Sequence, residues 1–152
     1  MSEHKKIISQ NKRALFNYFV EDRFEAGIVL KGSEMKSLRS GKANIEDAHA
    51  ANDGFEMVLY NLHIAEYDKA HQFNHAPRRP RKLLLHKREI RKIISKIRIK
   101  GYTLIALSLY FNEKNMAKIE LGVAKGKKLH DKRETIKEKD WEREKSRTLR
   151  QK

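Results

Sequence analysis

Apolar and polar residues alternate along several short segments of the chain, and a period of two is typical of half-buried β-strands. In the segment AKIELGVA, residues 117–124, Ile, Leu and Val alternate with Lys, Glu and Gly, so one face should be buried and the other wet. The apolar run YTLIALSLYF at 102–111 precedes it, separated by residues 112–116. The pattern therefore predicts an antiparallel hairpin.

Two earlier regions also predict strands. Residues 17–30 (NYFVEDRFEAGIVL) are rich in aromatic and β-branched residues but are interrupted by Glu21 and Asp22, which predicts one long bent strand or two short ones. Between residues 45 and 67, short apolar runs flank the sequence Asn52-Asp53-Gly54. An Asp-Gly pair suits a tight turn, so we expect a second hairpin here.

In two places the pattern indicates helices. Ser33 is a candidate N-cap for a short helix over 34–40, which Gly41 would end. Over 87–100, four isoleucines fall at the spacing i, i+3, i+4 and i+7, which predicts a helix with one apolar stripe that stops at Gly101. The stretch 69–82 contains both prolines of the chain and is predicted to be a loop.

Several short strands and two small helices in 152 residues predict a mainly β fold, namely a small closed or nearly closed antiparallel barrel. The oligonucleotide-binding fold is the commonest RNA-binding version of such a barrel. A chain of this length builds one modest core. We expect a flexible N-terminus at 1–10, a barrel domain at 11–128 and a tail at 129–152, in a protein that is monomeric when free.

The tail differs from the rest of the chain because it has few residues that could form a core. From residue 131 onward its large apolar residues are Ile136, Trp141 and Leu149, which do not share a helical face. Ordering about 20 residues costs on the order of 1–2 kcal/mol each, whereas burying three such side chains returns roughly 1.5–3 kcal/mol apiece. We therefore expect a tail that is disordered in the free protein and helical on an anionic partner.

Charge points to the nature of that partner. The chain carries 35 Lys and Arg against 20 Asp and Glu, a formal net charge of +15. Residues 69–100 hold 12 basic residues and one acidic residue, and residues 126–152 hold 11 basic and 6 acidic residues. Such clusters indicate a polyanion, because phosphates offset the repulsion between them. An anionic membrane would favour an amphipathic helix with exposed aromatic residues, and none is evident, so nucleic acid is predicted.

Other features of the composition exclude several classes of protein. Cysteine is absent, which excludes disulfides and thiolate metal sites. No stretch approaches the roughly 20 apolar residues of a membrane span, and the opening MSEHKKIISQNK lacks the apolar part of a secretion signal. His71 and His75 are four apart, but their loop context argues against a metal site. We expect a cytoplasmic protein with no metal, no cofactor and no membrane partner.

Four longer strings point to a known family. NKRALFNYFVEDRFEAGIVLKGSEMKSLRSGKANI, PRRPRKLLLHKREI, YTLIALSLYF and ELGVAKGKKLHDKRETIKEKDW together resemble the SsrA-binding protein family, also called small protein B, over nearly the whole chain. Members of that family bind transfer-messenger RNA and carry it to stalled bacterial ribosomes for trans-translation, which rescues the ribosome and tags the nascent peptide for degradation. The resemblance implies this role, an oligonucleotide-binding-type barrel and a tail that is unstructured in isolation.

The resemblance also implies which residues bind. In the family, the barrel grips the tRNA-like end of the RNA near its elbow and D-arm, through positions that match Asn11, Lys12, Arg13, Glu25, Arg81, Lys82, Leu84 and Lys118. The tail enters the decoding region and mRNA channel of the small ribosomal subunit, through positions that match Lys127, Lys128, His130, Asp131, Lys132, Arg133, Ile136 and Trp141. Glu66, where the family often has proline, and Ala76, where aspartate is common, depart from the pattern in loop-like sequence and affect local loop shape.

Several of these residues also have simpler explanations. From the residues alone, Glu25 is more typical of a solvated strand position and Leu84 of a core residue, whereas Lys118 is equally typical of a solubilising lysine. In an RNA site, a carboxylate accepts from base amino groups or holds a cationic side chain in register, which contributes orientation and not charge affinity. His130 lies among lysines, where a flat ring can stack on an exposed base.

Two other functions compete with an RNA adaptor. A structural ribosomal protein is also small, basic and tailed. An RNA-processing enzyme would need an acid/base pair or a metal site, and the sequence has no compact carboxylate cluster, no HxExxH-like ligand set and no glycine-rich phosphate loop. We therefore expect a protein that binds RNA without catalysis.

Overall fold

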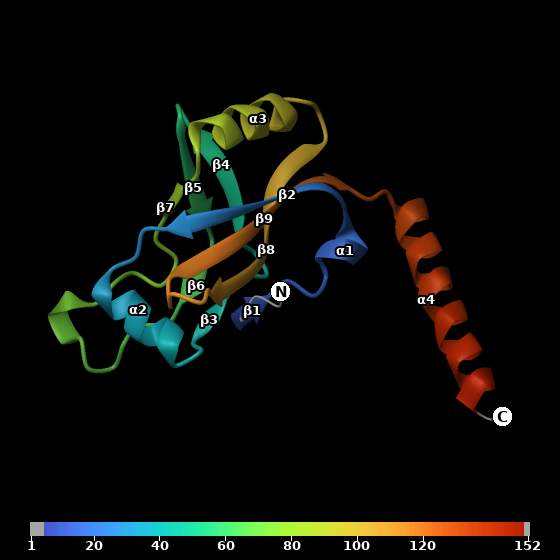
Figure 1. Ribbon diagram of the computed structural model, residues 1–152, viewed down its shortest axis with the longest axis horizontal. Helices are drawn as coiled ribbons and strands as arrows, with labels where there is room; N and C mark the ends of the chain where they lie inside the picture. Colours follow the sequence, from blue (N-terminus) through green and yellow to red (C-terminus); the bar gives the residue numbers. More distant parts are fainter. Residues whose placement is uncertain (1–4, 151–152) are drawn as a thin grey trace.

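Most of the strands form one sheet that closes on itself (Figure 1). The computed structural model describes residues 5–150, apart from the side chains of residues 71, 129–131, 135 and 146–150. The ring runs in the order β8 (Tyr102–Phe111), β9 (Ala117–Gly126), β2 (Tyr18–Ile28), β7 (Arg81–Leu84), β5 (Glu56–Tyr60) and β4 (His49–Asp53), which pairs again with β8. All of these pairings are antiparallel, so the closed antiparallel arrangement predicted from the sequence is confirmed.

Three further strands lie at the margins. β1 (Lys6–Gln10) pairs with the end of β8, and β3 (Ala43–Asn44) pairs with β6 (His63–Ile64). The sequence did not predict β1, which falls in the segment expected to be flexible. Its partner is distant in the chain, since Ile7 lies opposite Tyr110, so no local pattern marks it. A short helix, α1 (Ala14–Asn17), then leads into β2.

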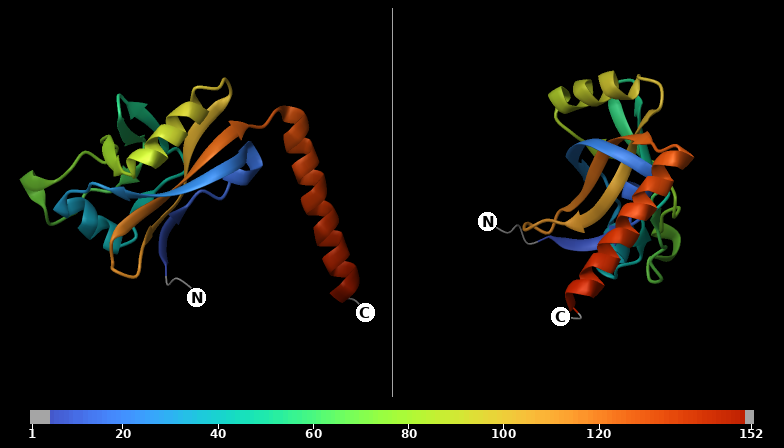
Figure 2. Two further views of the ribbon diagram at one scale, coloured as in Figure 1. Left: turned by 45° about the horizontal axis from the view of Figure 1, so that its top comes forward. Right: turned by 90° about the vertical axis from the view of Figure 1, so that its right-hand side faces the viewer.

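The core fills the inside of the ring, and α3 (Lys87–Ile97) lies across one end (Figure 2). Ile90 and Ile93 are buried there, with Ile94 and Ile97 packed against the core, as the isoleucine stripe predicts. The helix ends at Ile97, short of the expected residue 100. Gly101, with a φ of +92°, then turns the chain into β8.

The second helix, α2 (Gly32–Arg39), begins earlier than predicted. Its N-cap is Lys31 and not Ser33, and the backbone N–H of Lys31 donates to Oε1 of Glu34 at 2.9 Å. Ser33 lies inside the helix, where its hydroxyl shares a 2.8 Å hydrogen bond with Nδ1 of His75. Gly41 follows the helix with a φ of +72°, which fits the predicted end.

Both predicted hairpins are confirmed. β4 and β5 pair down to Asp53 and Glu56 across the turn at Gly54, and β8 and β9 form the longer hairpin. The predicted loop over 69–82 is partly wrong, because it contains the 3-10 helix η1 (His71–Phe73) and the first residues of β7. The short β7 lacks a local turn signal, and its partners β2 and β5 hold it in place.

Bulges in β2 and β8 change which side chains face the core. The register of β2 against β9 shifts between Val20 and Asp22, which confirms the predicted break at this point. Because one residue is extra, Tyr18 and Val20 pack outside the ring against α1, whereas Phe24 packs on the main core. Gly122, predicted on a wet face, is buried there, and a Cβ would lie 3.0 Å from Val20.

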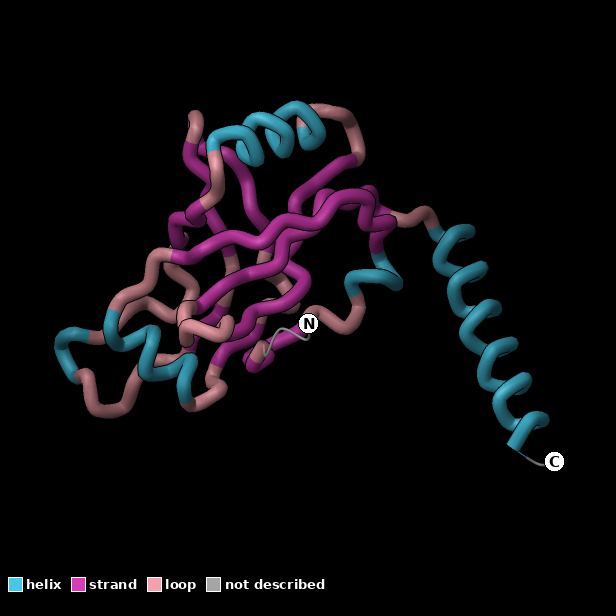
Figure 3. Tube along the Cα trace, viewed as in Figure 1, coloured by secondary structure: helices cyan, strands magenta, loops and turns pink. Residues whose placement is uncertain are grey.

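The tail is the helix α4 (Leu129–Arg150), which extends away from the ring (Figure 3). It carries Ile136 and Trp141 with 46% and 64% of their surfaces exposed. Disorder of this segment in the free protein stays a prediction. Within residues 5–150, no helix is both long enough and apolar enough to cross a lipid bilayer.

Candidate RNA interface

One row of side chains crosses five neighbouring strands on the outer face of the ring. Ile7 of β1 lies opposite Tyr110 of β8, and Tyr110 lies opposite Lys118 of β9. Lys118 in turn lies opposite Gly27 of β2, and Gly27 lies opposite Leu84 of β7. Directly paired residues point to the same side of a sheet. The strand register therefore brings Lys118 and Leu84, two of the predicted RNA-binding residues, to one place.

Glu25 joins this group because it lies two residues before Gly27 on the same strand. The group lines a pocket of about 310 Å³, which we call the Glu25 pocket, formed by Glu25, Gly27, Leu84, Leu85, His86, Glu89 and Lys118. Leu84 is 54% exposed, so it is not the core residue that its type suggests. Three predicted residues from three strands thus meet in one site.

Gly27 shapes this pocket by having no side chain. A Cβ at this position would lie 3.3 Å from Cβ of Leu84 and 3.7 Å from Nζ of Lys118. Leu84 and Lys118 approach the backbone of β2 this closely because nothing projects from it. The pocket therefore has a backbone floor between an apolar wall and an ammonium group.

Glu25 and Lys118 have opposite charges but form no ion pair with each other in the described part of the chain. Glu25 instead accepts a hydrogen bond at Oε2 from the hydroxyl of Tyr110. Its neighbour across β9 is Glu120, whose charge is paired with Arg23 at 2.8 Å. The pocket therefore presents a carboxylate acceptor and a separate ammonium donor to a ligand.

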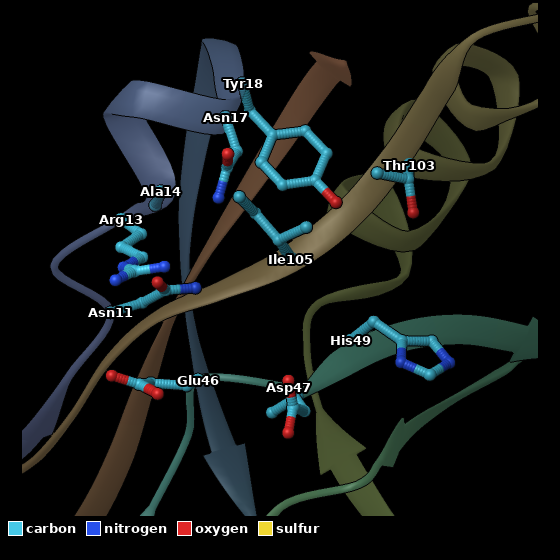
Figure 4. A pocket seen from close by; sticks show the side chains of 11 residues that line it. Asn11, Arg13, Ala14, Asn17, Tyr18, Glu46, Asp47, His49, Thr103 and Ile105 are labelled. Atoms are coloured by element: carbon cyan, nitrogen blue, oxygen red, sulfur yellow. The ribbon is translucent and has the colours of Figure 1, made fainter. Parts of the chain in front are cut away.

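Asn11 and Arg13 line a second pocket, of about 760 Å³, at the other end of β8 (Figure 4). The pocket is lined by Asn11, Arg13, Ala14, Asn17, Tyr18, Glu46, Asp47, Ala48, His49, Thr103 and Ile105. Asn11 fixes the loop before α1, since its backbone N–H donates to the carbonyl of Leu107 at 2.8 Å. Lys12 is exposed beside this pocket but does not line it. The predicted residues thus form two groups.

Arg81 is fully buried, which contradicts a direct RNA contact by its side chain. Its guanidinium donates through Nε to Glu34 and through Nη1 to the carbonyl of Leu62, the latter at 2.6 Å. In β7, residues 81 and 83 point inward and residues 82 and 84 point outward. Sequence reasoning missed this because Arg81 lies in a basic stretch, 47 positions from Glu34.

Glu34 keeps its charge in this buried setting. Burial by itself raises the pKa of Glu34, but hydrogen bonds from Arg79, the Lys31 N–H and Arg81 outweigh that effect. The pKa of the Glu34 carboxyl therefore lies below its ordinary value. Glu34 and Arg81, both buried, and the partly exposed Arg79 thus form a charged network that joins α2 to β7.

Lys82 points outward on β7, as an RNA-binding lysine should. Its Nζ lies 3.2 Å from Oε1 of Glu56, and both side chains are more than half exposed. Exposed pairs of this kind contribute only about 0–1 kcal/mol. A phosphate can therefore replace Glu56 as the partner of Lys82 at little cost.

The start of the tail is attached to α1 and β2. The backbone N–H of Lys127 donates to the carbonyl of Asn17 at 2.8 Å, and Nζ of Lys127 lies 4.8 Å from the ring centre of Phe19. Nζ of Lys132 lies 5.9 Å from the ring centre of Phe16. The predicted tail residues from His130 onward lie on α4.

Four of the eight predicted tail residues are exposed. Lys128, Arg133, Ile136 and Trp141 are open to solvent, and Nζ of Lys145 lies 5.2 Å from the Trp141 ring. The side chains of His130 and Asp131 lie outside the described residues, so their roles stay predictions. Exposed large apolar side chains beside cations are typical of a surface that a partner covers.

His75 is held inside the fold by its own contacts. His75 is 3% exposed, and Nε2 of its ring lies 2.9 Å from the carbonyl oxygen of Ile64. Together with Ser33 this partner makes His75 a structural residue. Among the described residues, no group of three or more His, Asp or Glu side chains is arranged to hold a metal ion, and the side chain of His71 is not among them.

Sequence reasoning missed Gly27, which lines the Glu25 pocket, and Tyr110, whose hydroxyl donates to Glu25. The signal for Gly27 was its place two residues after Glu25, and for Tyr110 it was a hydroxyl in an otherwise apolar strand. Neither signal identifies a site without the strand register.

Comparisons with known proteins identify the family. The SmpB protein family model matches residues 8–151. SsrA-binding proteins of Rickettsia felis and Rickettsia conorii are each 72% identical over 152 residues, which is 100% of this chain and 100% of each relative. The chain belongs to the SmpB family. A solved SmpB-family chain, described as "tmRNA-SmpB: a journey to the center of the bacterial ribosome", is 48% identical, with a TM-score of 0.67 over 79% of this chain and 84% of that chain. The predicted family is confirmed.

Proposed function

We propose that this SmpB-family protein is a non-catalytic adaptor that binds the tRNA-like part of transfer-messenger RNA and delivers it to stalled ribosomes for trans-translation. The SsrA-binding relatives and the solved chain described with tmRNA and the ribosome support this function. The observation that carries it in this chain is the row from Ile7 to Leu84, which groups Glu25, Leu84 and Lys118 in one pocket.

The barrel domain, residues 11–128, binds one folded RNA by its shape. Thr103 of β8 lines the pocket beside Arg13, whereas Tyr110, near the other end of β8, donates a hydrogen bond to Glu25 of the Glu25 pocket. At roughly 3.3 Å per strand residue, these positions lie about 20 Å apart. An RNA that engages both must present a surface several nucleotides long, which favours a structured RNA over a short single strand.

The tail, residues 129–152, acts in the decoding region and mRNA channel of the small subunit. Lys127, Lys128, Lys132 and Arg133 supply charge where the tail begins, and Ile136 and Trp141 supply exposed apolar surface further along α4. Ribosomal RNA offers the phosphates and bases that these groups bind.

The adaptor makes and breaks no covalent bond, uses no cofactor and works in the cytoplasm, where its two partners are. Its affinity comes from Lys and Arg at phosphates and its orientation from Glu25 and the pocket shape. With 6–10 phosphate contacts, affinity should fall by about 10³–10⁵-fold between about 50 and 200 mM salt.

A filter-binding assay tests the proposal. The full-length protein should bind the tRNA-like domain more tightly than generic RNA of equal length, and Glu25→Ala should reduce that preference. Glu113→Ala is the matched control, because Glu113 is exposed on the β8–β9 turn, away from the pocket. Equal affinity of the wild-type protein for both RNAs would contradict the proposal.

Ribosome stoichiometry separates the adaptor from a structural ribosomal protein. An adaptor should be substoichiometric in purified ribosomes and enriched on stalled ones. Full occupancy on translating ribosomes would favour the ribosomal protein instead.

A further inference from the structure

We propose that Tyr110 is a positioning residue, which fixes the Glu25 carboxylate so that its free oxygen accepts a single hydrogen bond from the RNA. The inference rests on the proposed function, because it concerns how the Glu25 pocket recognises that RNA. It names both an additional residue of the site and the chemistry that the site accepts.

Tyr110 is held rigidly. It is 1% exposed, Ile7 lies directly opposite it on β1, and Nζ of Lys5 lies 4.7 Å from its ring centre. Its hydroxyl donates to Oε2 of Glu25 from the neighbouring part of the outer face. A buried ring covered in this way cannot turn freely, so the donor has a fixed position in the site.

Glu25 needs such a partner. Its side chain is exposed on β2 and forms no ion pair with a cation in the described part of the chain. Lys118 faces the same pocket, and without Tyr110 the carboxylate would be free to turn toward that ammonium group. A closed Glu25–Lys118 pair would neutralise both of these groups. The Tyr110 hydroxyl keeps them apart.

The commitment of one oxygen limits what the other can bind. A carboxylate with two open oxygens can accept the two parallel N–H donors of a guanine edge, but the Tyr110 hydroxyl fills one acceptor position of Oε2 of Glu25 and competes with the second donor there. A phosphate is repelled by the carboxylate and is left to Lys118. The group that fits Glu25 best is therefore a single neutral O–H or N–H donor, from a ribose 2′-hydroxyl or from the amino group of an unpaired base.

A double-mutant cycle tests the positioning role. Affinity for the tRNA-like domain is measured for the wild type, Tyr110→Phe, Glu25→Ala and the double variant. Tyr110→Phe removes only the hydroxyl and should weaken binding about 3- to 10-fold in the wild-type background. In the Glu25→Ala background it should change affinity by less than about twofold, because the group that it positions is gone. Equal losses in both backgrounds would overturn the inference.

Tyr102→Phe is the matched control. Tyr102 lies on the same strand, and its hydroxyl also donates to a carboxylate, Oε1 of Glu21, at 2.8 Å. Unlike Glu25, Glu21 does not line the Glu25 pocket. The control should leave RNA affinity unchanged, and a loss as large as that of Tyr110→Phe would show a general effect of removing such hydroxyls. Thermal unfolding of each variant separates a loss of binding from a loss of fold.

Nucleotide-analogue interference identifies the donor. Pools of the tRNA-like domain carry either sparse 2′-deoxy sugars or bases without their amino group, such as inosine for guanosine. A position whose modification weakens binding to the wild type, but not to Glu25→Ala or Tyr110→Phe, marks the donor. A signal in the first pool assigns a 2′-hydroxyl, and a signal in the second assigns a base amino group. Interference patterns that are the same for all three proteins would overturn the inference.

The binding assays test the role of Tyr110 and the proposed function separately. Failure of the wild-type protein to prefer the tRNA-like domain contradicts the proposed function. Specific binding by the wild type that is insensitive to Tyr110→Phe leaves the proposed function intact and overturns only the role of Tyr110.

Discussion

Arg81 and Glu34, 47 positions apart in the chain, form an ion pair in which both side chains are fully buried. Arg81 belongs to β7, the strand that carries Lys82 and Leu84 on its outer side. The pair therefore fixes the position of two candidate RNA-binding residues although it touches no ligand itself. The ion pair therefore supports the site by stabilising the position of β7.

Arg81→Ala should lower the free energy of unfolding by about 3–5 kcal/mol, because it leaves the buried charge of Glu34 without its fully buried partner. Urea unfolding followed by circular dichroism measures the change. Arg78→Ala is the control, since Arg78 is exposed in the loop that precedes β7, and it should stay within about 0.5 kcal/mol of the wild type. A loss below about 1 kcal/mol for Arg81→Ala would show that the pair is not essential.

Acid should destabilise the protein through Glu34. The pKa of Glu34 is lowered in the folded state, so its contribution to stability is present above the ordinary glutamate pKa of about 4.3 and is lost as the pH falls toward the lower folded value. Carboxyl ¹³C chemical shifts should show Glu34 still ionised at pH values below the ordinary glutamate pKa. Protonation of Glu34 at or above the ordinary glutamate pKa would contradict the prediction.

Lys118→Ala should weaken RNA binding and reduce the slope of log affinity against log salt by about one. The reason is that one ammonium group, which has no carboxylate partner in the described part of the chain, is lost from the Glu25 pocket. Lys114→Ala, on the exposed β8–β9 turn, removes the same charge outside the pocket. If both variants shift the slope equally, Lys118 acts only through net charge.

Gly27→Ala should reduce RNA affinity by about tenfold, with destabilisation limited to about 1 kcal/mol. The new Cβ would lie 3.3 Å from Cβ of Leu84, so the pocket wall must move by a few tenths of an ångström. Gly32→Ala is the control, because a Cβ there meets nothing within 4 Å. If a folded Gly27→Ala protein kept its RNA affinity, the backbone at Gly27 would not be part of the RNA-binding site.

Truncation after Lys128 should preserve binding to the tRNA-like domain and abolish ribosome rescue, because the Glu25 pocket lies within residues 11–128. A trans-translation assay with purified ribosomes and filter binding measure the two activities. Circular dichroism of a peptide covering 129–152 should show little helix in plain buffer, as the entropy of ordering predicts. Loss of both activities on truncation would contradict the division of labour.

Local sequence patterns predicted the elements whose partners are near in the chain. The β8–β9 hairpin and α3 follow from alternation and from the isoleucine stripe, because each pattern reflects one buried face. β1 and β7 were missed, since their short segments are defined by pairing with distant strands. The inward turn of Arg81 was missed for the same reason.

The candidate site was predicted as residues and not as a geometry. The family resemblance supplied Glu25, Leu84 and Lys118, but only the register places them together around Gly27. Tyr110 lies in an otherwise apolar strand segment, where an aromatic residue is usually needed for the core. Its hydroxyl contact with Glu25 depends on a pairing across β9 that no local pattern contains.

The bulge in β2 has a consequence for how this protein can vary in length. The shift between Val20 and Asp22 lets the first half of β2 pack under α1 and the second half fill the ring, with Glu25 outside. Removing one residue between Tyr18 and Gly27 would turn the side chains of one half to the opposite face of the sheet, and no single substitution can repair that. We therefore expect working relatives to exchange side chains along this strand freely while insertions and deletions are excluded from it.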